Sequence, residues 1–163
     1  MPTDPTLVSP DDVKTIIEAS QIIDVRLDEI QAGPLSGDLS DAIVRFRRDL
    51  SEYGFSDDRA AMLVKIPHTA EWVKESPDGA VEVLARVRLV HVAHFSLTAE
   101  LPDRPSAISA WIDTNVYFMA YPYVRAAFHT VASILDYPSF TLGYLKREDS
   151  LPAVREGGDS AAD

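Results

Sequence analysis

The stretch from Val81 to Leu97 constrains the fold of this chain more than any other part of its sequence. Alternate residues are almost all apolar: Val81, Val83, Ala85, Val87, Leu89, His91, Ala93, Phe95 and Leu97. Because successive side chains of a strand point to opposite faces, this pattern predicts one strand with a buried face. Strands usually have about 5–6 residues, so one this long belongs to a large or bent sheet, or to a sheet that crosses a subunit interface.

Three earlier segments also alternate. They are QIIDVRLDEI, AIVRFRRDL and AAMLVKIPHTAEW, and we expect a strand in each. In the first, Ile23, Val25 and Leu27 oppose Asp24, Arg26 and Asp28. In the third, one face carries Met62, Val64, Ile66, His68, Ala70 and Trp72. Pro67 has no amide hydrogen for a strand ladder, which predicts an edge or a bulge there. The segment EYGFSDD is interpreted as a turn.

Helices are expected at both ends of the strand region. Ser9 and Pro10 suit the cap and first residue of a short N-terminal helix. A further short helix is expected around Trp111, followed by a long helix from about Tyr121 to Asp136. Proline in a helix interior costs about 3 kcal/mol, so Pro122 is interpreted as a first-turn residue after a break near Asn115.

These elements predict an α+β fold, in which a four-stranded antiparallel meander packs against one long helix. We expect a flexible N-terminus over residues 1–8 and a single domain over residues 9–146. Residues 147–163 are polar and contain few large apolar side chains, which is typical of a disordered acidic tail.

The charge of the chain excludes some functions. The 163 residues have a formal net charge of -11 and a pI of about 4.7. Such a surface repels phosphate backbones, so we expect no nucleic-acid partner. No apolar run approaches the ~18 residues that span a bilayer, and no leader pattern is present. We therefore expect no membrane insertion and a cytoplasmic location. Without cysteine, disulfides and thiolate sites are excluded.

Catalytic and metal-binding patterns are missing from the sequence. His91 and His94 lie three apart on a strand, so their rings diverge, and His91 is interpreted as a core or interface residue. Asp24, Asp28 and Glu29 are more typical of a solvated strand face than of a catalytic cluster. The chain has no nucleophile elbow and no phosphate or dinucleotide loop. We expect no metal, no cofactor and no enzymatic activity.

Large aromatic side chains are numerous, and the segment YFMAYPYVRAAFHTVASILDYPSFTLGYL resembles the main helix and following segment of the SecB protein-export chaperones. Its Tyr121, Pro122, Tyr123 and Arg125 match an aromatic-Pro-Tyr-x-Arg motif that opens that helix in the family. Pro138, Phe140 and Leu142 match the later segment. The resemblance covers about residues 21–145. The start of this region is closer to the SecB-like chaperones of actinobacterial toxin–antitoxin–chaperone systems than to the proteobacterial type.

The resemblance implies a holding chaperone that uses no ATP and binds unfolded preproteins or an antitoxin. It implies a homo-oligomer, as a dimer or a dimer of dimers. The implied client-binding residues are Phe95, Trp111, Tyr117, Phe118, Tyr137, Phe140 and Leu142. Asp24 and Asp28 correspond to the family's contacts with the SecA motor, although Arg88 stands where the family has an acidic contact. The alternative interpretation is a cone-shaped ligand-binding protein or small enzyme, with His91 or tyrosines in a closed pocket.

Overall fold

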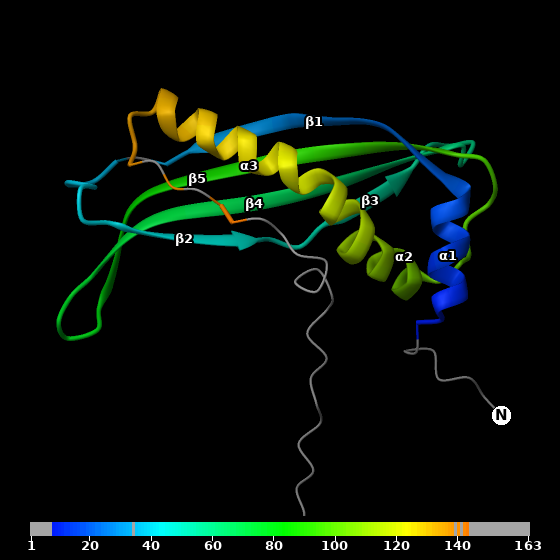
Figure 1. The fold of residues 1–163 in the computed structure, drawn as a ribbon, viewed down its shortest axis with the longest axis horizontal. Helices are drawn as coiled ribbons and strands as arrows, with labels where there is room; N and C mark the ends of the chain where they lie inside the picture. Colours follow the sequence, from blue (N-terminus) through cyan, green and yellow to red (C-terminus); the bar gives the residue numbers. More distant parts are fainter. Residues whose placement is uncertain (1–7, 34, 139, 141, 144–163) are drawn as a thin grey trace, which may run out of the picture.

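The computed structural model describes residues 8–33, 35–138, 140 and 142–143. The predicted tail over residues 147–163 lies outside the described residues, as does the predicted flexible N-terminus apart from Val8. Figure 1 shows one sheet with a helical layer lying diagonally across one face and a short helix at one end. The elements are α1 (Pro10–Ala19), β1 (Ser20–Ala32), β2 (Ile43–Arg48), β3 (Glu52–Phe55), β4 (Ala61–Glu75), β5 (Val81–Leu97), α2 (Pro105–Trp111), η1 (Ile112–Val116) and α3 (Tyr117–Ile134).

Helix α1 begins as its sequence predicts. The Ser9 hydroxyl accepts a hydrogen bond from the Asp11 amide at 3.3 Å, and Pro10 is the first helical residue. The helix passes directly into β1 at Ser20. Its last carbonyl, on Ala19, accepts a hydrogen bond from the Thr98 amide at 2.8 Å. This contact fixes the start of β1 beside the end of β5.

The sheet is antiparallel throughout, with strand order β1-β5-β4-β2 and β3 paired to β4. The predicted α+β class and the long strand over Val81–Leu97 are confirmed. The prediction of four strands was wrong, because Glu52–Phe55 forms a strand where a turn was expected. The predicted meander order was also wrong for the first strand, since β1 pairs with β5 and not with β2. That pairing sets the apolar Ile22 and Val25 opposite Phe95 and Ala93 on one face.

Pro67 lies where the outer edge of the sheet changes strand. β2 pairs with residues 68–73 of β4, and β3 pairs with residues 62–65. The Pro67 carbonyl accepts a hydrogen bond from the Asp49 amide, between the two strands. Nitrogen and carbonyl of one strand residue point to the same side, so the proline nitrogen faces the gap in the ladder. The predicted interruption at Pro67 is confirmed.

The helical layer is continuous from α2 through η1 to α3. The predicted break near Asn115 and the helix start at Pro122 were both wrong, because Asn115 lies in η1 and Pro122 lies inside α3. η1 is a single π-helical turn, in which the Tyr117 amide donates to the Ile112 carbonyl. Burial of one face of α3 against the sheet offsets the local cost of the proline. That face consists of Tyr117, Ala120, Val124, Phe128, Val131 and Ala132.

The core lies between the helical layer and one face of the sheet. Every residue of the predicted β4 face, from Met62 to Trp72 in steps of two, is fully buried. The central part of the predicted β5 face, from Ala85 to Phe95, is at most 1% exposed, which confirms that His91 is a core residue. Two apolar clusters form along this face, one below α1 and α2 and one below α3. The long helix is therefore held over the middle of the sheet.

Candidate functional site

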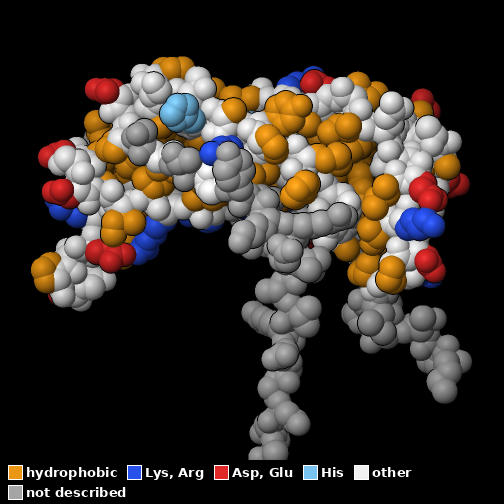
Figure 2. All heavy atoms as spheres, in the orientation of Figure 1, with side chains coloured by type: hydrophobic (Ala, Val, Ile, Leu, Met, Phe, Trp, Pro, Cys, Tyr) orange, Lys and Arg blue, Asp and Glu red, His pale blue; other side chains and the backbone are white. Residues whose placement is uncertain are grey.

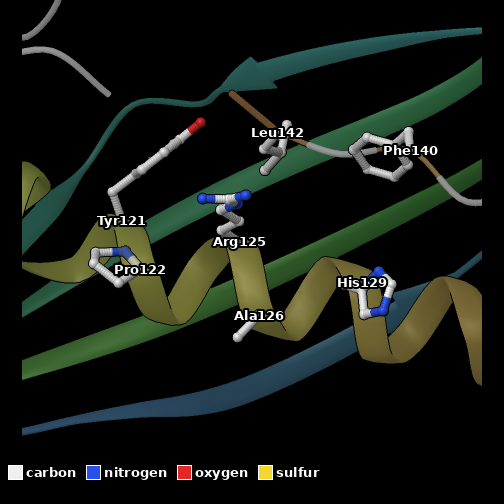
Figure 3. A pocket seen from close by; sticks show the side chains of 7 residues that line it. All are labelled: Tyr121, Pro122, Arg125, Ala126, His129, Phe140 and Leu142. Carbon is white, nitrogen blue, oxygen red and sulfur yellow. The ribbon is translucent and has the colours of Figure 1, made fainter. Parts of the chain in front are cut away.

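A first groove lies between α3 and the segment that follows it. We call it the α3 groove, and its volume is about 480 Å³. Figure 3 shows side chains of α3 on one side of this groove, with Phe140 and Leu142 facing them from the later segment. The Tyr121 hydroxyl donates a 2.9 Å hydrogen bond to the Gly143 carbonyl, which ties the two walls together. The lining residues are Tyr121, Pro122, Arg125, Ala126, His129, Phe140 and Leu142.

A second groove lies at the start of β1, beside the π-turn. We call it the β1 groove, and its volume is about 410 Å³. Phe95 and Trp111 are almost fully buried and form its floor, with their rings in edge contact at 4.9 Å. Phe118 is 44% exposed and provides an aromatic wall of the groove. The lining residues are Ile17, Ser20, Gln21, Ile22, Phe95, Trp111, Thr114, Asn115, Phe118 and Met119.

Apolar side chains continue across the helix-bearing surface outside the grooves. Figure 2 shows them spread over the middle of this surface, with charged side chains gathered mostly near its two ends. The large exposed apolar residues of α3 and β1 that line neither groove are Tyr123, Ile134, Ile23, Leu27 and Ile30. Exposed apolar surface of this kind marks sites that contact another protein or an apolar ligand. The sequence of α3 contains no acidic residue at all.

Two buried histidines anchor the start of α3 to the sheet. The His68 ring stacks between Phe46 and Tyr117, with ring centroids 5.5 Å apart in both contacts. The ring centroids of His91 and His68 lie 6.4 Å apart. Burial, with a contribution from neighbouring His91, lowers the pKa of His68 to about 3. Burial lowers the pKa of His91 to about 4, so both rings are neutral near pH 7.

Tyr117 belongs to this anchor. Burial raises the pKa of its phenol to about 12, and the Arg48 guanidinium lies 4.5 Å from its ring centroid. Arg48 also forms an ion pair with Asp113 of η1. The end of β2 is thus connected to the π-turn by charge and to α3 by a cation–π contact. These contacts hold the helix that both grooves share.

The predicted client-binding residues do not form one surface. Phe95, Trp111 and Phe118 meet in the β1 groove, and Phe140 and Leu142 meet in the α3 groove. Tyr117 and Tyr137 line neither groove. Tyr117 packs on His68, and Tyr137 makes an edge contact with Trp72 at 4.9 Å.

The motif residues Tyr121, Pro122 and Arg125 line the α3 groove, whereas Tyr123 lies outside both grooves and is 53% exposed. Sequence reasoning missed several lining residues, including Ile17, Ile22, Asn115, Met119, Ala126 and His129. The only sequence signal for them was that His129 lies off the buried stripe of the helix.

The acidic residues predicted to contact a motor protein lie on β1. Asp24 is exposed and lies opposite His94 in the strand register. Asp28 is exposed at a bulge and lies 3.8 Å from Arg26. Arg88 lies 3.7 Å from Glu29, and so brings positive charge to the same part of the sheet.

The described residues give little support for a metal site, a closed ligand pocket or a membrane-spanning helix. Within them, no three histidine, cysteine, aspartate or glutamate side chains come together as a metal site would require. The alternative interpretation, a cone-shaped ligand-binding protein or small enzyme, places His91 in a closed pocket. His91 lines neither groove and is buried in the core. Across the part of the chain that the structure describes, no helix has the length and apolar character to cross a bilayer.

The sequence matches no protein-family model and no curated protein. The structure, however, has a SecB-like fold: an antiparallel sheet with a long helix across one face, as the resemblance in sequence implies. The solved structure that shows this is the SecB-like chaperone Rv1957 of Mycobacterium tuberculosis, in complex with a ChAD peptide from the antitoxin HigA1. The TM-score is 0.66 at 20% identity, over 83% of this chain and 97% of that one.

A protein of unknown function from Streptococcus agalactiae is a looser match. Its TM-score is 0.40 at 14% identity, over 77% of this chain and 97% of the other. That likeness is too low to support an argument about fold or function.

Proposed function

We propose that this protein is a holding chaperone, which binds non-native protein segments in the α3 groove and the β1 groove without ATP or another cofactor. The observation that carries the proposal is the pair of apolar grooves beside α3 on a SecB-like fold. Holding an unfolded segment needs apolar contact area and no reacting group. The proposed activity is therefore binding and not catalysis.

The sizes of the grooves suit single side chains or short segments of a client. Each large apolar side chain that is fully buried contributes about 1.5–3 kcal/mol. Two grooves engaged by one chain act together, because the second binding event becomes intramolecular. A client is thus retained by several weak contacts, none of which requires one defined sequence.

Two kinds of client fit this proposal: unfolded preproteins destined for export, or one dedicated antitoxin. The antitoxin is favoured by the fold neighbour Rv1957, whose solved structure contains an antitoxin peptide. The two are separated by comparing the affinity for an apolar antitoxin extension with that for an unfolded preprotein. A dedicated chaperone binds the extension at least tenfold more tightly, while an export chaperone binds both similarly.

Binding of a SecA-like motor through Asp24 and Asp28 is a further part of the proposal. Both carboxylates are exposed on β1. Reversal of both to lysine should remove binding to such a basic partner and leave client holding nearly intact. Loss of client holding in this variant would mean that clients are bound by charge, contrary to the groove proposal.

We also propose that the protein acts in the cytoplasm as a dimer or a dimer of dimers. β1 is a long outer strand of the sheet, and exposed Ile22, Leu27 and Ile30 lie along it. An uncovered edge of this length is normally protected or paired. Light scattering at micromolar concentration tests this proposal, and a monomeric mass would contradict it.

The groove proposal is tested by changing one exposed ring. Phe118→Ser removes a wall of the β1 groove, and we expect it to weaken holding of an unfolded protein about fivefold or more. Tyr123→Ser is the matched control, because Tyr123 is exposed on the same helix but lines neither groove.

Suppression of aggregation is measured for both variants against a chemically denatured client. Circular dichroism and light scattering must first show that each has the wild-type fold and mass. Equal activity of Phe118→Ser and wild type would refute client binding in the β1 groove. Equal losses in both variants would mean that the helix surface binds clients without using the groove.

A further inference from the structure

The polar side chain of Asn115 gives the β1 groove a feature that a general affinity for apolar segments does not use. We propose that Asn115 determines which segments this groove accepts, by taking a backbone N–H of the client beside the apolar side chain that enters the groove. The ligand class is an extended peptide segment with a large apolar residue and no proline next to it. The inference rests on the proposed function, because it specifies how one of the two grooves recognises a client.

The carboxamide of Asn115 is oriented by a short chain of hydrogen bonds along the helix. The Thr114 hydroxyl donates to the Ala110 carbonyl at 2.8 Å, and Nδ2 of Asn115 donates to the same hydroxyl at 2.9 Å. A hydroxyl has one proton, and a carbonyl can only accept. The group of Asn115 that faces Thr114 must therefore be its NH₂, and the carboxamide oxygen Oδ1 points away from Thr114.

The Oδ1 atom of Asn115 is left without a partner. Among the residues that the structure describes, none donates a hydrogen bond to it. The buried polar atoms that lack a partner are Ser51 Oγ, His68 Nε2 and His91 Nδ1. Asn115 Oδ1 is not one of them, so it is accessible at the surface. Because Asn115 lines the β1 groove, this groove combines an accessible acceptor with an apolar floor.

The position of Asn115 favours a role in binding over a role in folding. Asparagine is unfavourable in a helix interior, because its side chain competes with the backbone for hydrogen bonds. Asn115 caps no helix end, since α2, η1 and α3 follow one another without a break. It lies in the π-turn η1, and single π-turns inside helices are frequently found at functional sites.

An accessible acceptor makes the β1 groove selective once a client covers it. An apolar segment that lies over Oδ1 removes its water, and an acceptor left unpaired in this way weakens binding. A client that supplies a donor avoids this loss, which corresponds to about fivefold or more in affinity. The groove thus distinguishes segments by a hydrogen bond as well as by apolar contact.

The donor that fits the groove best is the backbone of the client. None of the residues that line the groove carries a formal charge, so it offers no opposite charge to a charged side chain. When an apolar side chain rests on Phe95 and Trp111, the nearest donors are the backbone N–H groups beside it. Those groups are already bonded in a helix, and proline has none, so an extended segment without proline provides the donor.

The experiment uses four fluorescein-labelled peptides that differ only in backbone methylation. The parent sequence is Ser-Gly-Ala-Leu-Phe-Leu-Ala-Gly-Ser with blocked ends. The other three carry an N-methyl group on the first leucine, on the phenylalanine or on the second leucine, which removes one N–H each. Affinity for the full chain is measured by fluorescence anisotropy. We expect at least one N-methyl peptide to bind about fivefold more weakly than the parent.

Variants locate the source of this loss. In Asn115→Leu, which has a similar shape but no acceptor, the ratio between the parent and that N-methyl peptide should fall to about one. Asn115→Asp keeps an oxygen acceptor, so the ratio of about fivefold should remain. Ser20→Ala is the matched control, because it removes a polar group from the β1 side of the same groove, and it too should keep the ratio. Circular dichroism establishes that all variants are folded.

The outcomes separate this inference from the proposed function. Equal binding of the four peptides to wild type overturns the inference alone, and so does a ratio that persists in Asn115→Leu. Loss of the ratio in Ser20→Ala overturns the assignment to Asn115. In each of these cases a chemically denatured protein is still held. Failure of every peptide and of denatured protein to bind overturns the proposed function and the inference with it.

Discussion

The two faces of the sheet differ most clearly at neighbouring residues of β4. Trp72 faces the helical layer, is fully buried and contacts Tyr137 and Phe140. Glu71 faces the other way and forms ion pairs with Arg86 at 2.6 Å and Arg47 at 3.3 Å. One step along the chain thus passes from an apolar core to a charged surface.

The charged face is extensive and largely paired within itself. Arg47 also contacts Asp49 at 2.9 Å, and Asp49 accepts a hydrogen bond from the Thr69 hydroxyl at 2.7 Å. Arginine and carboxylate side chains that satisfy one another offer little to an apolar client. The difference between the faces teaches where the two proposed grooves lie, since both are on the helix-bearing side.

The largest effect that tests this comparison is expected at Trp72. Replacing Trp72 with alanine should lower the free energy of unfolding by about 3–5 kcal/mol, because it removes a large buried side chain and leaves a cavity. Urea denaturation measures this loss. A change below about 1 kcal/mol would mean that the helical layer does not pack tightly on this face.

A smaller effect per residue is expected from pH, through the two buried histidines. In the unfolded chain both rings titrate near pH 6.5, but in the folded protein the pKa is about 3 for His68 and about 4 for His91. The unfolded state therefore takes up protons first as the pH falls. Stability is fully present above about pH 6.5 and declines below it, by about 2 kcal/mol per histidine at pH 5.

The measurement compares urea denaturation at pH 7 and pH 5 in wild type and in His68→Phe. The variant should lose about 2 kcal/mol less than wild type over this interval, since it has one titrating ring fewer. An unchanged pH dependence would show that His68 is accessible to protons in the folded state.

On the charged face, Glu71→Gln should lower the free energy of unfolding by about 1 kcal/mol. The loss should shrink when salt is added, because part of it comes from partly exposed ion pairs. Urea denaturation at low and high salt checks both statements. A loss as large as that of Trp72→Ala would show that the two faces contribute equally to stability.

The smallest effect is expected for Leu63, an apolar residue on the charged face that is 44% exposed. Leu63→Ser should change the free energy of unfolding by less than about 0.5 kcal/mol and leave the oligomeric mass unchanged. Light scattering and urea denaturation provide the two readings. A shift in mass would reveal that copies of the chain meet through the face that we assign to solvent.

Much of the sheet was predictable from sequence, and for physical reasons. The alternation over Val81–Leu97 runs without interruption, so both ends of β5 were predicted as they are observed. β3 was missed because Glu52–Phe55 has only four residues, too few for a period to be recognised. The position of β1 beside β5 depends on contacts between residues that are distant in the sequence, such as Ala19 with Thr98.

The helical layer and the grooves were less predictable. Asn115 and Pro122 are local signals for a break, yet packing on the sheet and the π-turn keep the helix continuous through both. Aromatic spacing did not distinguish Trp111, which is 1% exposed, from Phe118, which projects from the same helical layer. Only the placement of α3 across the sheet decides which of these rings reaches solvent.

The gap in the ladder at Pro67 affects how many copies of the protein can add to the edges of its sheet. The outer edge beside β4 is divided between two short strands, whereas β1 offers an edge of thirteen residues on the other side. A sheet that can be extended at both edges grows into a fibre, but one with a single usable edge stops when two copies have met. For the holding chaperone that we propose, this arrangement favours the pairing of two copies over polymerisation through the sheet.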